Sequence, residues 1–511
     1  MRYRIVVIGL LLLTSVSSCG VLSNIMAYTV TLDNRMPINQ QIISGNRIYI
    51  VKQDFNLHGE KVNIPEGCTL KFISGSIRNG TLSGAKTVVK TETTRPIFYD
   101  LKLTGTFTAK EFPINAFITD KLDYFYGFLQ AFSGTELYLT DDYRVMQFQG
   151  EIDRIFPEYI NIDGRGHKIC LYSFGAYKVK KCKIRNITVE SCYNIEPESG
   201  WKKDKYNFGI VGGKESSIEF KNVTFTKECD FAYIRGFKNL DISDCIGEGS
   251  YFFIYECDNI LFYNNKIANA PEGFHSIGGG DASNKVQIFD NHFLNINGGG
   301  IILTGGLKYN VNIVNNELVN VGSGGAAKSC INIHPGGTTI VKGNIIIANK
   351  GASTLDIDAA RINYYSDRTS VTVEDNVIEN IEGDTSIHNI ALVGLGKLYF
   401  MNNKVRDQRV YFWDTPYMEF RNNTVSFTKG FDASTEIGVM STGETTVNKP
   451  YQHVFENNFF DIPESTGTVH FKYRSNEPIR IVGKGNKYSS PVDFVDQYKM
   501  FEASGDIKIY K

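Results

Sequence analysis

A short pattern of apolar and polar positions recurs along most of the chain. In each copy, apolar residues alternate with polar ones, a polar residue interrupts them, and a second alternation follows, as in FYNNKI, VEDNVI and FMNNKV. Alternation with a period of two predicts a strand with one buried face, and asparagine between two such runs predicts a tight bend. The chain is therefore expected to be a series of short strands. The interrupting residues are Asn186, Asn222, Asp244, Asn265, Asn291, Asn316, Asn344, Asn376, Asn403, Asn423, Asn458 and Asn486.

The spacing of these residues predicts a solenoid. The twelve positions span 300 residues, so the mean repeat is about 27 residues, within the range of solenoid proteins. Each coil of a β-solenoid pairs only with the coils before and after it, about 4.8 Å away. The recurring residues would then form a ladder at the bend, so we interpret the sequons at Asn222 and Asn423 as ladder positions rather than glycosylation sites.

The region before the repeats is also rich in strands. Residues 28–112 are expected to form lead-in coils, and residues 113–511 the solenoid domain. Just after this boundary, LDYFYGFLQAF places apolar residues at helical spacing. This predicts a helix that caps the solenoid with one apolar stripe. Thr119 or Asp120 is expected to be its N-cap.

The stretch from this helix to YINIDGRGHKI resembles the start of many proteins of the pectate-lyase-like superfamily, in which a capping helix and a strand precede such a coil. The resemblance covers residues 115–511 and implies an all-β, right-handed parallel β-helix with a substrate groove on one sheet. It implies no particular reaction, because a fold does not determine chemistry. The motifs typical of polygalacturonase-like hydrolases, pectin methylesterases and common pectate lyases are not found in the sequence.

Two neighbouring strand-like segments carry a concentration of polar residues. In INIHPGG the isoleucines would face the core, so Asn332 and His334 would face outward, and in LDIDAAR the same alternation turns Asp356 and Asp358 outward. Because the segments belong to consecutive coils, these side chains are expected about one strand spacing, ~4.8 Å, apart. Together with Arg361, in the long loop that follows, they form the predicted catalytic set.

Aromatic and basic residues around this set are predicted to bind substrate. Aromatic rings stack on sugars, and cations suit anionic ones. Several of these residues fall in two coils that are longer than the mean repeat. The predicted substrate-binding residues are His275, Tyr364, Tyr365, Trp413, Trp201 and Lys205.

Three functions fit this set. The first and preferred one is a polysaccharide lyase that acts by β-elimination on a uronate-containing chain, pectin-like or glycosaminoglycan, with His334 or a loop tyrosine as the base. Asp356 and Asp358 would then orient the histidine or bind Ca²⁺, and no other metal is predicted. The second is an inverting glycoside hydrolase, because positions i and i+2 of a strand lie ~6.5–7 Å apart, close to the inverting carboxylate separation. The third is a glycan-binding or scaffold protein without catalysis.

The N-terminus predicts export. Arg2 and Arg4 precede an apolar run that is shorter than the about 20 residues needed to span a bilayer. VSSC then resembles a bacterial lipobox, with residues 1–19 as the signal peptide and Cys19 as the lipidated residue, and ordinary cleavage near Ala27 is the alternative. The expected location is the cell envelope, on the periplasmic or surface side of the outer membrane, with the lipid as the one membrane anchor.

The composition of the chain limits the kinds of binding partner that can be expected. A formal net charge of −1 offers no electrostatic surface for nucleic acid. The nine cysteines form no CxxC pair, so apart from Cys19 they are expected to be buried thiols, with Cys182 facing the core. We expect a monomer whose partner is its polysaccharide substrate.

Overall fold

The chain consists of two compact units, seen in a computed structural model. Residue contacts group residues 1–172 with 176–184, and residues 173–175 with 185–511. The predicted signal peptide and Cys19 lie outside the described residues, and the division predicted near residue 113 stays a prediction. The structure describes residues 28–145, 157–171, 174–191, 208–226, 229, 231–278, 285–307, 310–322, 329–359, 366–381, 388–428, 438–441, 451–461, 469–474, 479–489, 492–496, 501–505 and 509–510.

The first unit is built from parallel strands. One sheet contains β1 (Thr29–Thr31), β2 (Ile48–Val51), β3 (Phe55–Asn56), β4 (Lys61–Asn63), β5 (Thr69–Phe72), β6 (Ile77–Thr91), β7 (Phe98–Thr108) and β9 (Phe117–Ile118). The strands that follow are β8 (Glu111–Pro113), β10 (Glu136–Tyr138), β11 (Tyr143–Val145), β12 (Tyr159–Asp163) and β13 (Lys168–Leu171). A short helix, α2 (Ile38–Gln41), and a 3₁₀ turn, η1 (Ile114–Ala116), lie between strands.

The predicted capping helix is α3 (Leu122–Ala131), in this first unit. Its apolar stripe is buried, and the rings of Phe128 and Phe132 pack on Phe112 at centroid distances of 5.9 Å and 4.6 Å. The predicted N-cap is wrong, because the N-cap is Lys121, with no side-chain capping bond. Thr119 Oγ1 instead accepts the Lys121 amide at 3.1 Å, before the helix begins. Of the described residues, no helix is long and apolar enough to cross a membrane.

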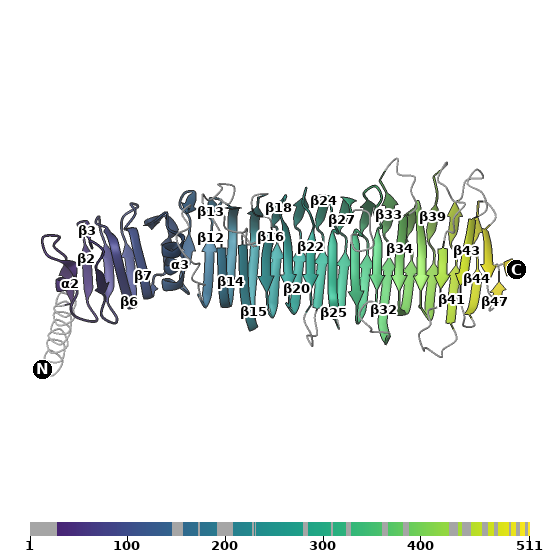
Figure 1. Cartoon of the computed structure of the whole chain (residues 1–511), viewed down its shortest axis with the longest axis horizontal. Helices are drawn as coiled ribbons and strands as arrows, with labels where there is room; N and C mark the ends of the chain where they lie inside the picture. The colour runs from purple at the N-terminus through teal and green to yellow at the C-terminus, as the bar shows by residue number, and fades with distance from the viewer. Residues whose placement is uncertain are drawn as a thin grey trace, which may run out of the picture. The chain divides into compact units, whose positions relative to one another are not determined.

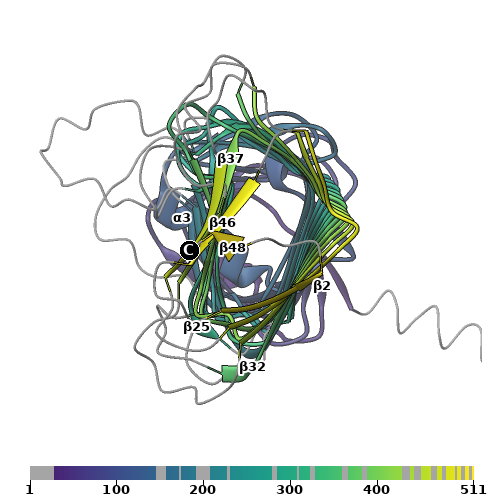
Figure 2. The ribbon, with the colours of Figure 1, turned by 90° about the vertical axis from the view of Figure 1, so that its right-hand side faces the viewer.

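The second unit is a right-handed parallel β-helix with three strands in most coils, as predicted. Each strand from β16 to β44 pairs in parallel with the strand three places later. Strands of successive coils lie side by side in Figure 1. The sheet that carries the predicted site contains β16 (Phe231–Arg235), β19 (Tyr251–Tyr255), β22 (Phe274–Ile277), β25 (Ile301–Leu307), β28 (Ile331–Pro335), β31 (Leu355–Asp358), β34 (His388–Val393), β37 (Gln408–Trp413), β40 (Gly438–Ser441), β43 (Val469–Arg474), β46 (Val492–Asp496) and β48 (Ile509–Tyr510). Viewed along the stack, the strands of successive coils lie behind one another (Figure 2).

Two further sheets complete the coils. The long strands β14 (Phe174–Ser191) and β15 (Phe208–Phe225) come first in the sequence. The second sheet then contains β17 (Asn239–Ser243), β20 (Asn259–Tyr263), β23 (Lys285–Phe289), β26 (Asn310–Val314), β29 (Thr338–Lys342), β32 (Ser366–Glu374), β35 (Leu395–Met401), β38 (Tyr417–Arg421), β41 (Tyr451–Glu456), β44 (Ile479–Lys484) and β47 (Phe501–Gly505). The third contains β18 (Ile246–Glu248), β21 (Lys266–Ala268), β24 (His292–Ile296), β27 (Glu317–Val321), β30 (Ile345–Ala348), β33 (Val377–Asn380), β36 (Lys404–Arg406), β39 (Thr424–Ser426), β42 (Phe459–Asp461) and β45 (Lys487–Tyr488).

A ladder of nine asparagines, eight of them buried and the last half-buried, runs along one bend of this β-helix. The Nδ2 of every member but the last donates to the Oδ1 of the next member, at distances of 2.9–3.2 Å. Each Nδ2 also donates to a backbone carbonyl, so the side chain satisfies buried backbone groups at the bend. The members are Asn265, Asn291, Asn316, Asn344, Asn376, Asn403, Asn423, Asn458 and Asn486.

The first three predicted ladder members are not in this ladder. Asn186, Asn222 and Asp244 have φ near +55°, and the residue after each of them occupies the buried position. From Asn265 onward, the residue before the ladder asparagine has this left-handed conformation, which asparagine, aspartate and glycine adopt most easily. The early coils therefore keep the bend but place an apolar residue or a cysteine where later coils place asparagine.

The cysteine prediction is confirmed in large part. Among the described residues, six cysteines are buried thiols outside any disulfide, including Cys182, which is 1% exposed. Burial raises the pKa of the Cys245 and Cys257 thiols to about 12. Cys170 departs from the prediction, because it is in a disulfide bond.

Candidate functional site

The core of the candidate site is formed by β28 and β31, neighbouring strands of one sheet. Their register pairs Asn332 with Asp356, between two pairs of core residues. His334 and Asp358 are the next outward positions along the same two strands. The prediction that the two segments lie in neighbouring coils is therefore confirmed, and the register brings these four predicted catalytic residues onto adjacent strands of one sheet.

The polar side chains at this point are buried although they are on the outer face of the sheet. The exposed fractions are 2% for Asn332, 4% for Asp356 and 8% for Asp358, and His334 is half-buried. Removing carboxylates from water costs free energy, and most outward residues of a solenoid do not incur this cost. Two buried aspartates on one strand are therefore unusual for outward positions of a solenoid, and they make this point the candidate site.

Two rows of outward side chains extend from the aspartates along the stacking direction of the strands. The row that we call the Asp356 row consists of Tyr233, Phe253, His275, Ile302, Asn332, Asp356, Ala391 and Tyr411. The row that we call the Asp358 row consists of Arg235, Tyr255, Ile277 and Thr304 and, after a register shift in β25, of Asp358, Val393 and Trp413.

The predicted substrate-binding residue His275 lies in the Asp356 row, three coils before Asp356. Its Nδ1 is 2.8 Å from Glu272 Oε2, and its ring meets the edge of Phe253 at a centroid distance of 4.8 Å. The carboxylate fixes the orientation of the imidazole, as carboxylates do in many functional sites. Sequence reasoning singled out the histidine but missed Glu272, three residues earlier.

Trp413 lies in the Asp358 row, two strands after Asp358. It is 41% exposed, and its ring lies edge-to-face with Tyr411 at a centroid distance of 6.2 Å. An exposed tryptophan on the same face as a buried carboxylate pair is a suitable stacking surface for a sugar ring.

A buried polar network supports the strand that carries the aspartates. Thr354, just before β31, donates through Oγ1 to Gln408 Oε1 at 3.1 Å. Gln408 begins β37 and donates through Nε2 to Asn380 Oδ1. The network ties the start of the aspartate strand to the strand of Trp413, and it joins residues 54 positions apart, so no local sequence pattern signals it.

The remaining predicted residues cannot be assigned to the site. Arg361, Tyr364, Tyr365, Trp201 and Lys205 all lie outside the described residues. The predicted Ca²⁺ also stays a prediction, since neither aspartate belongs to a group of three or more metal-binding side chains among the described residues.

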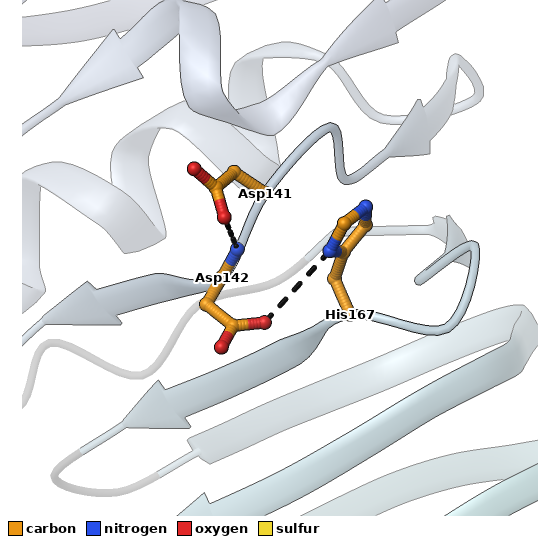
Figure 3. Close-up of side chains that lie close together, drawn as sticks. All are labelled: Asp141, Asp142 and His167. Atoms are coloured by element: carbon orange, nitrogen blue, oxygen red, sulfur yellow. Dashed lines mark hydrogen bonds and ion pairs between the residues drawn. The ribbon is translucent and has the colours of Figure 1, made fainter.

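One group with metal-binding donors occurs in the described part of the first unit. Asp141 and Asp142, before β11, converge with His167, before β13, with donor atoms within 4.8 Å of one another (Figure 3). The aspartates are exposed, and Asp142 Oδ1 already accepts the Lys168 amide at 2.8 Å. The donors suit a divalent cation, but exposed acidic groups of this kind are common without one.

Known proteins offer no match from which a function could be assigned. The functional assignment therefore depends on the fold and on the sheet face that carries Asp356 and Asp358. No known protein family matches the sequence, and no curated protein matches it either. Fold and site together define the class: a right-handed parallel β-helix with a buried aspartate pair on the outer face of one sheet.

Proposed function

We propose that this chain is an exported carbohydrate-active enzyme of the pectate-lyase-like type, which cleaves a polysaccharide at Asp356 and Asp358. The observation that carries the proposal is the burial of both carboxylates side by side on an outer face, with aromatic residues in the same rows on either side of them. Aromatic rings and carboxylates are the side chains that sugar binding and glycosidic chemistry require.

Hydrolysis with inversion is the reaction that this arrangement supports best. Residues i and i+2 of one strand are ~6.5–7 Å apart, close to the separation that leaves room for a water molecule beside the sugar. One aspartic acid would give its proton to the leaving glycosidic oxygen, while the other carboxylate takes a proton from the attacking water. The C1–oxygen bond of the linkage breaks, and the bond from C1 to the water oxygen forms on the opposite face.

A lyase is the second candidate, and the position of His334 favours it. His334 shares β28 with Asn332, beside the aspartate strand. In β-elimination, Asn332 would stabilise the uronate carboxylate, and His334 would remove the C5 proton, with Asp356 and Asp358 as supports. The C4–oxygen bond then breaks, the leaving oxygen takes a proton from the protonated His334 or from water, and the product carries a C4–C5 double bond.

Export with a lipid anchor at Cys19 is also part of the proposal. The disulfide at Cys170 supports an oxidising compartment, where such bonds persist. In a Gram-negative host, Cys19→Ser is expected to move the protein from the membrane fraction to the soluble fraction and to abolish incorporation of labelled palmitate. Unchanged membrane association would contradict the anchor.

A polysaccharide panel read in two ways tests the enzyme proposal. Purified protein is incubated with polygalacturonate, chondroitin sulfate, xylan and β-glucan, and both near-ultraviolet absorbance and new reducing ends are recorded. Hydrolysis gives reducing ends alone, and elimination gives both signals. Asp356→Asn and Asp358→Asn should abolish either signal, whereas Glu379→Gln, a carboxylate on another sheet, should leave it intact. Full activity in both aspartate variants would reject the proposal.

A further inference from the structure

The first unit begins with a group of exposed apolar side chains. Among the described residues, β1 pairs with a strand on one side only, β2, so β1 is the edge of its sheet. The helix α2 lies at this end of the unit, beyond β2 (Figure 1). Tyr28 precedes β1, and Met36 and Ile43 flank α2, with exposed fractions of 47%, 50% and 72%. Of the large apolar side chains in the described part of the chain, these three are the most exposed.

Hydrogen bonds hold the backbone beside two of these residues in place. The hydroxyl of the buried Tyr49 accepts the Ser44 amide at 3.1 Å and donates to the Ser44 carbonyl at 2.8 Å, directly after Ile43. On the other side of α2, Gln41 Nε2 donates to the Met36 carbonyl at 2.9 Å. The side chains of Ile43 and Met36 therefore face solvent from anchored turns. Exposed apolar groups gathered in one place are typical of an interaction surface.

Positive charge accompanies these apolar groups. Arg47 Cζ lies 5.2 Å from the ring centroid of Tyr28. From Tyr28 to Lys52 the basic residues are Arg35, Arg47 and Lys52 and the one acidic residue is Asp33, so this segment has a net charge of +2, against −1 for the whole chain. We call the three exposed apolar residues and Arg47 the end surface. Apolar side chains beside tyrosine and excess positive charge suit the headgroup region of an anionic lipid bilayer.

The position of the proposed lipid brings a bilayer within reach of the end surface. Cys19 precedes Tyr28 by nine residues. Nine residues span at most ~30 Å when the chain is fully extended. A lipid on Cys19 would therefore keep Tyr28 within that distance of the headgroups.

We propose that the end surface binds the lipid bilayer directly and thereby orients the protein on the membrane. Ile43 and Met36 enter the interfacial region, Tyr28 lies at the level of the headgroups, and Arg47 contacts anionic lipid. The inference rests on the proposed lipid anchor for bringing the membrane within reach, and it is independent of the reaction at Asp356. It adds a partner, an anionic lipid surface, to the polysaccharide substrate.

A dye at position 43 tests the contact in the lipidated protein. Ile43→Cys is labelled with the environment-sensitive dye NBD, and the protein is reconstituted on vesicles of phosphatidylcholine and phosphatidylglycerol. The emission should move to shorter wavelength, and lipids with a spin label near the headgroup should quench it about twofold. The matched control is Ile345→Cys, at a residue 42% exposed on β30 of the second unit, and its dye should show neither change. Equal responses at the two positions, or no response at position 43, overturn the inference.

Loss of the apolar side chains tests binding without the lipid. The mature chain with Cys19→Ser carries no lipid and is floated with the same vesicles and with vesicles of phosphatidylcholine alone. It should bind the anionic vesicles more tightly, and Met36→Ser combined with Ile43→Ser should weaken this binding about tenfold. The control pair, Leu294→Ser with Ile345→Ser, removes side chains 37% and 42% exposed on the third sheet and should leave binding unchanged. Equal losses in the two pairs, or absence of vesicle binding, overturn the inference.

Failure of this inference and failure of the lipid anchor are distinguishable. Incorporation of palmitate at Cys19 with an unchanged dye signal at position 43 would leave the anchor and remove the membrane contact. Vesicle binding through the end surface without incorporation of palmitate would remove the anchor and leave the contact. A dye emission that shifts without vesicles as the protein concentration rises would mean that a second copy covers the end surface, which also overturns the inference.

Discussion

Asn332 and Asp356 occupy the same outward position on neighbouring strands and are both almost fully buried. The amide of Asn332 carries no charge, whereas a carboxylate at position 332 would add a charge one strand spacing, ~4.8 Å, from Asp356. The identity of residue 332 therefore controls the charge that the site can hold.

Asn332→Asp is expected to destabilise the protein at neutral pH. Two charges ~4.8 Å apart repel by about 3 kcal/mol at the effective dielectric constant of a protein site. The repulsion raises the pKa of one carboxyl in the folded state above its unfolded value. The deficit against wild type should thus be present at pH 8 and shrink as the pH falls towards 5. Urea unfolding at both pH values measures it, and Asn332→Leu is the uncharged control, whose deficit should not depend on pH.

The asparagine ladder predicts a second effect on stability. Asn344 uses both ends of its amide: Oδ1 accepts two hydrogen bonds from Asn316, and Nδ2 donates to Ile313, Lys342 and Asn376. Asn344→Ala leaves buried backbone groups unsatisfied and should lower the free energy of unfolding by about 3–5 kcal/mol.

The control for the ladder comes from Asn315, the residue before the ladder member Asn316. Asn315 is exposed and has a φ of 55°, a conformation that glycine adopts without strain. Asn315→Gly should shift the urea midpoint little. Equal losses in Asn315→Gly and Asn344→Ala would mean that the ladder contributes nothing beyond the bend.

Local patterns were sufficient to predict the coils and the aspartate face. Successive side chains of a strand point to opposite faces of the sheet. The apolar residues that flank Asn332 and Asp356 are expected to face the core, so these two polar residues are expected to face outward. Stacking of coils then places them together, because each strand pairs with its equivalent in the next coil. The same reasoning failed at Asp244, which occupies the bend position. The buried position that later coils fill with the ladder asparagine is the next residue, Cys245.

Interactions between distant positions could not be predicted in this way. The contact of Gln408 with Thr354 depends on the lengths of two intervening coils and on side chains inside the bend. The carboxylate partner of His275 depends on the path of the chain just before β22. Neither relationship repeats along the chain, so the repeat pattern that revealed the fold carries no information about them.

The buried thiols predict slow chemical modification of the native protein. A thiol reacts as thiolate, and burial raises the pKa of Cys245 and Cys257 to about 12 and also raises that of Cys182 and Cys330. A disulfide reagent such as dithionitrobenzoate should leave these thiols unmodified at pH 8 and modify them after unfolding in guanidinium. Fast labelling of any of the four in the native protein, identified by peptide mapping, would contradict the packing described for the core.

The buried side chain of His453 is expected to make the stability of the C-terminal coils sensitive to acid. Its side chain is 3% exposed, and Nε2 donates to the Thr415 carbonyl at 2.9 Å. Burial lowers the pKa of His453 from 6.5 to about 4. The unfolded chain therefore takes up the proton first as the pH falls, and stability is lost between about pH 6.5 and pH 4. The loss attributable to this group is about 3 kcal/mol. The free energy of unfolding is measured for wild type and for His453→Gln across this pH range. The difference isolates the contribution of His453, because the two proteins share all other titrating groups. The wild type should lose more stability than the variant on acidification, and parallel pH profiles would show that His453 does not titrate in this way.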